Sequence, residues 1–138
     1  LEGVIDRGTG KKMKNIPLPL AGKTGTTNNN YDAWFVGYTP NLVIGVYVGF
    51  DEPRTLGKFE TGAKAALPIF QEIIKKIPKK NISPLFKIPS TINLAFTDSH
   101  TGKISRIKKE NSVLEGFKEK NIIDNFYMDN QQKISTIY

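Results

Sequence analysis

The sequence contains no cysteine and only one histidine among its 138 residues. Without thiols, the chain has neither a disulfide framework nor a thiolate metal site. His100 alone does not make up the ligand set of a zinc ion, which several side chains must share. We therefore expect no metal and no cofactor.

Long hydrophobic runs are also missing. The longest apolar segment, residues 42–50, is too short to cross a bilayer. No charged segment followed by an apolar one precedes it, as a secretory leader would. We expect no membrane segment in this chain. The first residue is Leu rather than Met, which predicts a piece of a longer protein whose signal or anchor would lie upstream.

The net charge of +7 comes largely from one short stretch. Residues 1–60 are nearly balanced, and much of the excess comes from Lys75, Lys76, Lys79 and Lys80. We interpret these lysines as the solvated end of a helix, where cations also interact favourably with the helix dipole. A nucleic-acid footprint would instead spread along a face with interleaved aromatic residues. A small basic nucleic-acid-binding β protein is kept as an alternative, which would bind with a steep salt dependence.

Three successive segments favour β-strands. An apolar run over residues 16–22 leads into Lys23–Thr27, and an Asn-Asn-Asn turn follows. The next two segments are rich in β-branched and aromatic residues: 32–38 and 42–50. Because only Thr39-Pro40-Asn41 separates these two, we predict three neighbouring antiparallel strands.

Helical periodicity appears on either side of these strands. Leu1, Val4 and Ile5 have the spacing of one helical face. A second apolar stripe consists of Leu67, Phe70, Ile73, Ile74 and Ile77. Pro68 is tolerated in a first helical turn, and Pro78 ends the pattern. We predict an α+β fold, in which flanking helices cover a partial antiparallel sheet of three strands.

The remaining sequence, residues 78–138, predicts less. We treat residues 1–77 as one domain portion and 78–138 as a C-terminal extension. Within the extension, residues 79–89 indicate a linker or extended crossing, and segments 92–96 and 104–107 predict a hairpin. A short helix over 113–117, a strand over 122–128 and a disordered tail over the last ten residues are further expectations.

The strand end Lys23-Thr24-Gly25-Thr26 has the chemistry of a carboxylate receptor. The ammonium supplies charge, the hydroxyls supply directional hydrogen bonds, and the glycine lets another backbone approach. Strand alternation puts Thr24 and Thr26 on the face opposite Lys23 and Gly25, which leaves open which of them reach a ligand together. An ordinary polar strand end is the structural alternative. A phosphate loop is excluded, because its first glycine would fall on Pro17.

Several further motifs follow in a fixed order. After Lys-Thr-Gly-Thr-Thr come Asp-Ala-Trp-Phe-Val-Gly-Tyr-Thr-Pro (32–40), Gly-Phe-Asp-Glu-Pro (49–53), Glu-Thr-Gly (60–62) and Ala-Leu-Pro-Ile-Phe (66–70). Together they resemble the C-terminal part of the transpeptidase domain of a class A, or bifunctional, penicillin-binding protein. The resemblance implies the penicillin-binding transpeptidase or serine β-lactamase-like fold. It is strongest over residues 1–77.

The resemblance also implies roles for single residues. Lys23 would set the electrostatics of the site. Thr24, Gly25 and Thr26 would bind the terminal carboxylate of an acyl-D-Ala-D-Ala peptide or of a β-lactam, with the Thr26 backbone N–H in an oxyanion hole. The implied partners are the upstream remainder of the protein, the peptidoglycan stem peptide and β-lactams, and the implied location is the periplasmic face of the bacterial inner membrane.

This chain departs from the family pattern at the motif that carries the nucleophile. In the family, serine-x-x-lysine and serine-x-asparagine precede the lysine strand. The match here, Ser105-Arg-Ile-Lys108, follows it, and no serine-x-asparagine occurs. We interpret Ser105 as a chance match and expect the chain alone to be inactive. Ala63 stands where the family often has a second glycine. A non-catalytic remnant or peptidoglycan-binding module is the main alternative.

Two other clusters favour structural roles. Asp98-Ser99-His100 contains the residue types of a hydrolase triad, but sequence neighbours cannot adopt its relay geometry, so we read His100 as a turn residue. Trp34, Phe35 and Tyr47 lie in the most apolar part of the sequence. For them we predict core packing rather than stacking on nucleic acid.

Overall fold

The computed structural model describes residues 1–105 and 107–118. The chain divides into two units, Leu1–Lys87 and Ile88–Tyr138. The helices and strands of the first unit are α1 (Glu2–Asp6), the 3₁₀ turn η1 (Lys11–Met13), β1 (Ala21–Thr26), the turn η2 (Asn28–Asn30), β2 (Ala33–Thr39), β3 (Leu42–Val48), the π-helical turn η3 (Gly62–Ala66), α2 (Leu67–Lys76) and the 3₁₀ turn η4 (Lys79–Asn81).

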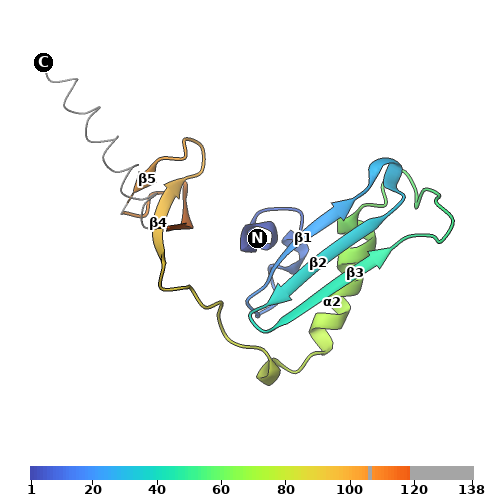
Figure 1. Cartoon of the computed structure of the whole chain (residues 1–138), viewed down its shortest axis with the longest axis horizontal. Helices are drawn as coiled ribbons and strands as arrows, with labels where there is room; N and C mark the ends of the chain where they lie inside the picture. The colour runs from blue at the N-terminus through green and yellow to red at the C-terminus, as the bar shows by residue number, and fades with distance from the viewer. Residues whose placement is uncertain (106, 119–138) are drawn as a thin grey trace, which may run out of the picture. The chain divides into compact units, whose positions relative to one another are not determined.

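The strands of the first unit form one antiparallel sheet in the order β1-β2-β3 (Figure 1). The connection between β2 and β3 is short, because Thr39 already pairs with Leu42. Asn29 and Asn30 have φ angles of 59° and 54° between β1 and β2, a conformation that asparagine tolerates better than most residues. The predicted α+β fold with three antiparallel strands is confirmed.

The two faces of this sheet differ in burial. Along β2, Ala33, Phe35 and Gly37 are buried, whereas Trp34 and Val36 are exposed. This alternation follows from the period of two in a strand. α2 lies against the face that carries Phe35 (Figure 1). The prediction of core packing is therefore confirmed for Phe35 and wrong for Trp34 and for Tyr47, which pairs with Trp34 on the open face.

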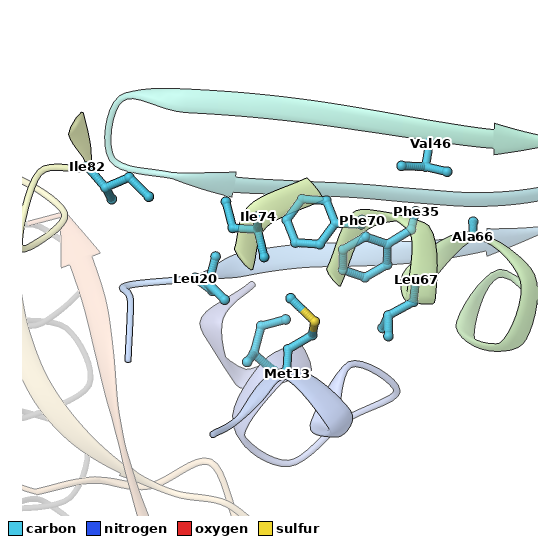
Figure 2. Packing of buried hydrophobic residues seen from close by; sticks show 10 residues of the cluster. Met13, Leu20, Phe35, Val46, Ala66, Leu67, Phe70, Ile74 and Ile82 are labelled. Carbon is cyan, nitrogen blue, oxygen red and sulfur yellow. The ribbon is translucent and has the colours of Figure 1, made fainter. Parts of the chain in front are cut away.

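The core forms between that face and the helical segments (Figure 2). Phe35 and Phe70 meet edge to face with ring centroids 4.9 Å apart, a geometry that aromatic pairs prefer. The other buried members of the cluster are Ile5, Met13, Leu20, Val46, Ala66, Leu67, Ile74 and Ile82. Of the predicted stripe on α2, Ile73 is 40% exposed, because it lies at the edge of the buried face.

Gly37 allows α2 to approach β2 closely. A Cβ atom at this position would come within 2.5 Å of the Phe70 ring and 2.7 Å of the Phe35 ring. A real Cβ does not reach such distances, so a larger residue would displace one of the two rings. Close packing of α2 on the sheet thus depends on the absence of a side chain at residue 37.

The segment after α2 is tied to the turn between β2 and β3. The Asn41 side chain donates to Asn81 O at 2.7 Å and accepts from the Ser83 N–H at 3.0 Å. Ile82 between them is buried. The segment expected to be a linker or extended crossing, residues 79–89, therefore begins with the 3₁₀ turn η4, and hydrogen bonds with the Asn41 side chain anchor its start.

The second unit contains β4 (Ile92–Asp98), β5 (Ile104–Ser105) and β6 (Ser112–Lys118) in the order β5-β4-β6. The predicted hairpin is present, since β4 and β5 pair in antiparallel fashion. The predicted helix over 113–117 is wrong, because β6 pairs with β4 along its whole length. Gly116 disfavours a helix by about 1 kcal/mol, and pairing with β4 satisfies the strand's backbone. The predicted strand over 122–128 and the predicted disordered tail lie outside the described residues.

Candidate functional site

The open edge of β1 exposes backbone groups of the lysine motif. In an antiparallel ladder, residues that exchange hydrogen bonds with the partner strand alternate with residues whose N–H and C=O groups point away from it. The Thr27 N–H donates to Asp32 O at 3.1 Å, which sets this alternation. The N–H groups of Thr24 and Thr26 therefore point away from β2, where no other strand of the described residues pairs with β1.

Lys23 reaches the same edge from the other face of the sheet. Its ammonium donates to Thr24 O at 2.8 Å, and this carbonyl points away from β2 by the same alternation. The lysine stem is long enough to turn around the edge of the strand. Residues 23, 24 and 26 thus contribute to one edge although their side chains start on opposite faces.

Thr9, in the loop after α1, contacts the Thr24 hydroxyl. The two Oγ1 atoms are 3.0 Å apart, and either one can be the donor. Nearby, the Gly22 N–H donates to Leu1 O at 3.4 Å, so the N-terminal segment runs along this edge. The sequence analysis assigned no role to Thr9 and missed this contact.

The Thr26 hydroxyl has a partner on the helical side. It accepts a hydrogen bond from the Gly62 N–H at 3.0 Å. Gly62 is buried and begins η3, which continues into α2. Sequence reasoning used Glu60-Thr-Gly62 for the family resemblance and assigned no role to Gly62.

Gly25 lies opposite Trp34 in the ladder. A Cβ atom at Gly25 would come within 3.2 Å of Trp34 Cβ, which is closer than most real contacts. The glycine of the motif therefore fits beside an aromatic residue on the open face. Trp34 is itself 4.8 Å from the Tyr47 ring, centroid to centroid.

Asp32 holds Tyr47 at the end of this aromatic pair. The Tyr47 hydroxyl donates to Asp32 Oδ1 at 2.9 Å. This hydrogen bond and the nearby carboxylate charges of Asp32 and Asp51 raise the pKa of Tyr47 above its ordinary value. The phenol therefore stays protonated and donating at neutral pH.

Ser105 does not have the setting of a nucleophile. It lies on the two-residue strand β5, and its hydroxyl donates to Ile107 O at 2.9 Å. The family motif needs a serine that opens a helix near the lysine strand. Our interpretation of Ser105-Arg-Ile-Lys108 as a chance match agrees with this position.

Asp98 and His100 belong to a turn between β4 and β5. Asp98 Oδ1 accepts hydrogen bonds from the His100 N–H at 3.0 Å, the Thr101 N–H at 2.8 Å and the Thr101 hydroxyl at 2.9 Å. These bonds, led by those from Thr101, hold the pKa of Asp98 below its usual value. The carboxylate is thus engaged by the turn itself, and His100 is a turn residue as predicted.

Within residues 1–105 and 107–118, no cluster of three or more His, Asp or Glu side chains has the arrangement of a metal site. Every helix in this part of the chain is too short or too polar to cross a bilayer.

The fold and the edge strand place the chain in a class. An antiparallel sheet, a covering helix and a lysine-threonine-glycine strand at the sheet edge define a segment of the penicillin-binding transpeptidase fold. No family model matches the sequence.

Penicillin-binding protein 1A of Rickettsia conorii is 46% identical over 122 residues, which cover 88% of this chain and 15% of that protein. Penicillin-binding protein 1A of Pseudomonas aeruginosa is 38% identical over 120 residues, covering 86% of this chain and 14% of that protein. The crystal structure of penicillin-binding protein 1A from Haemophilus influenzae superposes with a TM-score of 0.73 at 32% identity, covering 86% of this chain and 19% of that one.

The chain belongs to the class A penicillin-binding proteins and matches the C-terminal part of penicillin-binding protein 1A. It spans about 15% of the length of the curated relatives it matches. The predicted identity as a C-terminal fragment of the transpeptidase domain is confirmed.

Proposed function

We propose that β1 binds the carboxylate end of an acyl-D-Ala-D-Ala peptide, or of a β-lactam, as part of a D,D-transpeptidase site. One observation carries the proposal. The Lys23 ammonium lies at Thr24 O on the edge strand β1, and the N–H groups of Thr24 and Thr26 point away from β2 along that edge. The Thr24 and Thr26 hydroxyls belong to the same strand and contact Thr9 and Gly62. An anion bound there would be neutralised by the lysine and held by directional donors.

The edge also suits an extended peptide. The N–H and C=O groups of Thr24 and Thr26 point away from β2, so a ligand can pair with them as an added strand. Gly25 between them has no side chain. In this arrangement Lys23 supplies the electrostatic term, the two threonines bind the carboxylate, and the Thr26 N–H faces the developing oxyanion.

The reaction would be acyl transfer through a serine ester. A serine hydroxyl from another segment of the full protein attacks the carbonyl of the penultimate D-Ala, and the terminal D-Ala leaves with a proton. The amine of a second stem peptide then takes the acyl group and releases the serine. The product is a peptide crosslink in peptidoglycan. The full protein would also carry a glycosyltransferase domain and act at the periplasmic face of the inner membrane.

Labelling with a fluorescent penicillin tests this function. The 138-residue chain is assayed alone and mixed with the polypeptide encoded upstream, which would carry the serine-x-x-lysine motif. We expect label on the upstream polypeptide and only when the chain is present. Label on the chain alone would overturn the proposed division of roles, and no label in any mixture would favour a peptidoglycan-binding module instead.

Two matched lysine variants distinguish the effect of the ammonium at the site from the effect of the overall positive charge. Lys23→Met removes the ammonium at the edge, whereas Lys14→Met removes one from the exposed loop before β1. Charge-assisted hydrogen bonds contribute about 1.5–3 kcal/mol, so Lys23→Met should slow labelling by about 10-fold to 100-fold. Lys14→Met should leave labelling unchanged. Equal effects of the two variants would contradict a role for Lys23 in the site.

A further inference from the structure

The Gly62 N–H fixes the role of the Thr26 hydroxyl as an acceptor toward the helix. The donor–acceptor distance is 3.0 Å. The first N–H groups of a helix lack intrahelical partners, and Thr61, the residue before η3, makes no side-chain capping hydrogen bond. Thr26, a residue 36 positions earlier in the sequence, satisfies this N–H instead.

Gly62 cannot be replaced without moving β1 or β2. A Cβ atom at Gly62 would come within 2.5 Å of Gly25 O and would also collide with Trp34 O. Both oxygens belong to the ladder between the two strands, so they cannot move aside as a flexible side chain would. The φ angle of Gly62 is not among the positive values, so the requirement for glycine comes from space. Gly62 therefore lies directly against the backbone of the lysine motif.

A hydroxyl has one proton to donate and two lone pairs that accept. Because the Gly62 N–H occupies a lone pair of Thr26 Oγ1, the Thr26 proton must point to another acceptor. Thr26 lies on the edge strand two residues after Thr24, whose carbonyl oxygen accepts a hydrogen bond from the Lys23 ammonium. A carboxylate held by that ammonium would offer an oxygen to the Thr26 proton, and hydrogen bonds in such a chain strengthen one another.

We propose that Gly62 is a positioning residue for carboxylate binding, which holds the Thr26 hydroxyl as a donor toward the bound ligand. This inference rests on the proposed function of β1. It extends the site from the lysine motif to the start of the helix that covers the sheet. The opposing explanation is that Thr26 only caps the helix.

Amide chemical shifts of the full 138-residue chain distinguish these explanations. The probes are N-acetyl-D-Ala-D-Ala and its methyl ester, which lacks the carboxylate charge. We expect the free acid to shift the Thr24 and Thr26 amides, and to shift the Gly62 amide downfield in parallel. The ester should do neither. Thr26→Val should abolish the Gly62 response, and Thr26→Ser, which keeps the hydroxyl, should restore it.

Gly62→Ala is the direct variant, with Ala63→Gly as the control at the neighbouring position. We expect Gly62→Ala to reduce the affinity ratio of acid over ester by about tenfold or more, because a charge-assisted hydrogen bond is lost. Ala63→Gly should leave the ratio unchanged. If Gly62→Ala does not fold, the shift of the Gly62 amide, its loss in Thr26→Val and its return in Thr26→Ser still distinguish the two explanations.

The two proposals fail differently. If the acid shifts Thr24 and Thr26 while Gly62 does not respond, Thr26 is only a helix cap and the positioning role is refuted, whereas β1 as a carboxylate site stands. If neither probe shifts Thr24 or Thr26, the proposed function of β1 fails, and the positioning role fails with it. An unchanged acid-to-ester ratio in folded Gly62→Ala also refutes the positioning role.

Discussion

Two glycines in one sheet should respond to the same substitution with opposite signs. Gly37 on β2 faces Phe70, and a Cβ there would come within 2.5 Å of the Phe70 ring. Gly45 on β3 has no heavy atom within 4 Å of a Cβ added to it. Neither glycine has a positive φ angle, so alanine fits the backbone at both positions.

The magnitudes follow from packing and from chain entropy. Ordinary van der Waals contact begins near 3.4 Å, so Gly37→Ala pushes the Phe70 ring outward by close to 1 Å. Phe70 is 1% exposed and has little free space around it. Such overpacking costs about 1–3 kcal/mol. Replacing glycine by alanine also restricts the unfolded chain, which stabilises by about 0.4–1 kcal/mol at both positions.

We therefore expect Gly37→Ala to lower the free energy of unfolding by up to about 2.6 kcal/mol and Gly45→Ala to raise it by about 0.4–1 kcal/mol. Urea unfolding followed by the fluorescence of Trp34, the only tryptophan, measures both. Far-ultraviolet circular dichroism checks that the two transitions coincide. Shifts of the urea midpoint in the same direction and of similar size would refute the argument from the Phe70 contact.

Three further predictions follow from the same structure. Phe70→Ala should lower the free energy of unfolding by about 3–5 kcal/mol, and Ile73→Ala, at a 40% exposed position on the same helix, by about 1 kcal/mol; equal losses in urea unfolding would contradict the assigned core. Tyr47 has a raised pKa, so its stabilising hydrogen bond is present below the ordinary tyrosine pKa and is lost as pH rises through the folded value. Ultraviolet titration at alkaline pH should show its pKa falling in Asp32→Asn. Asp98 has a lowered pKa, so its hydrogen bonds stabilise the fold above the ordinary carboxyl pKa, and this stabilisation is lost as pH falls through the folded value. NMR titration of the carboxyl groups should show an Asp98 midpoint below those of carboxyl groups in the unfolded chain.

Local patterns in the sequence were sufficient for much of the fold. β-branched and aromatic segments separated by a short turn determined the strands β2 and β3. The apolar run before Lys23 and the asparagine turn after Thr27 indicated β1. The apolar stripe with Pro68 and Pro78 determined α2, since helical periodicity and proline positions are local signals. The prediction of a helix over residues 113–117 was wrong because this short apolar pattern fits a helix or a strand equally well. Pairing with β4 decides for the strand.

The candidate site divides in the same way. The sequence alone determined the lysine, the threonines and the glycine of the motif, because their chemistry lies in neighbouring residues. Only the tertiary structure decided how they meet. Strand alternation puts Lys23 and Thr24 on opposite faces, and the hydrogen bond from the ammonium to Thr24 O brings them to one edge.

The supporting contacts depended on the tertiary structure entirely. Thr9 and Gly62 reach the motif from 15 and 36 residues away, and no local pattern specifies a contact at such separation. The burial of Phe35 and the exposure of Trp34 and Tyr47 likewise depended on which face α2 covers. All three side chains are aromatic and lie in an apolar part of the sequence, so the sequence does not distinguish them. Their burial depends on which face of the sheet is covered by the helix.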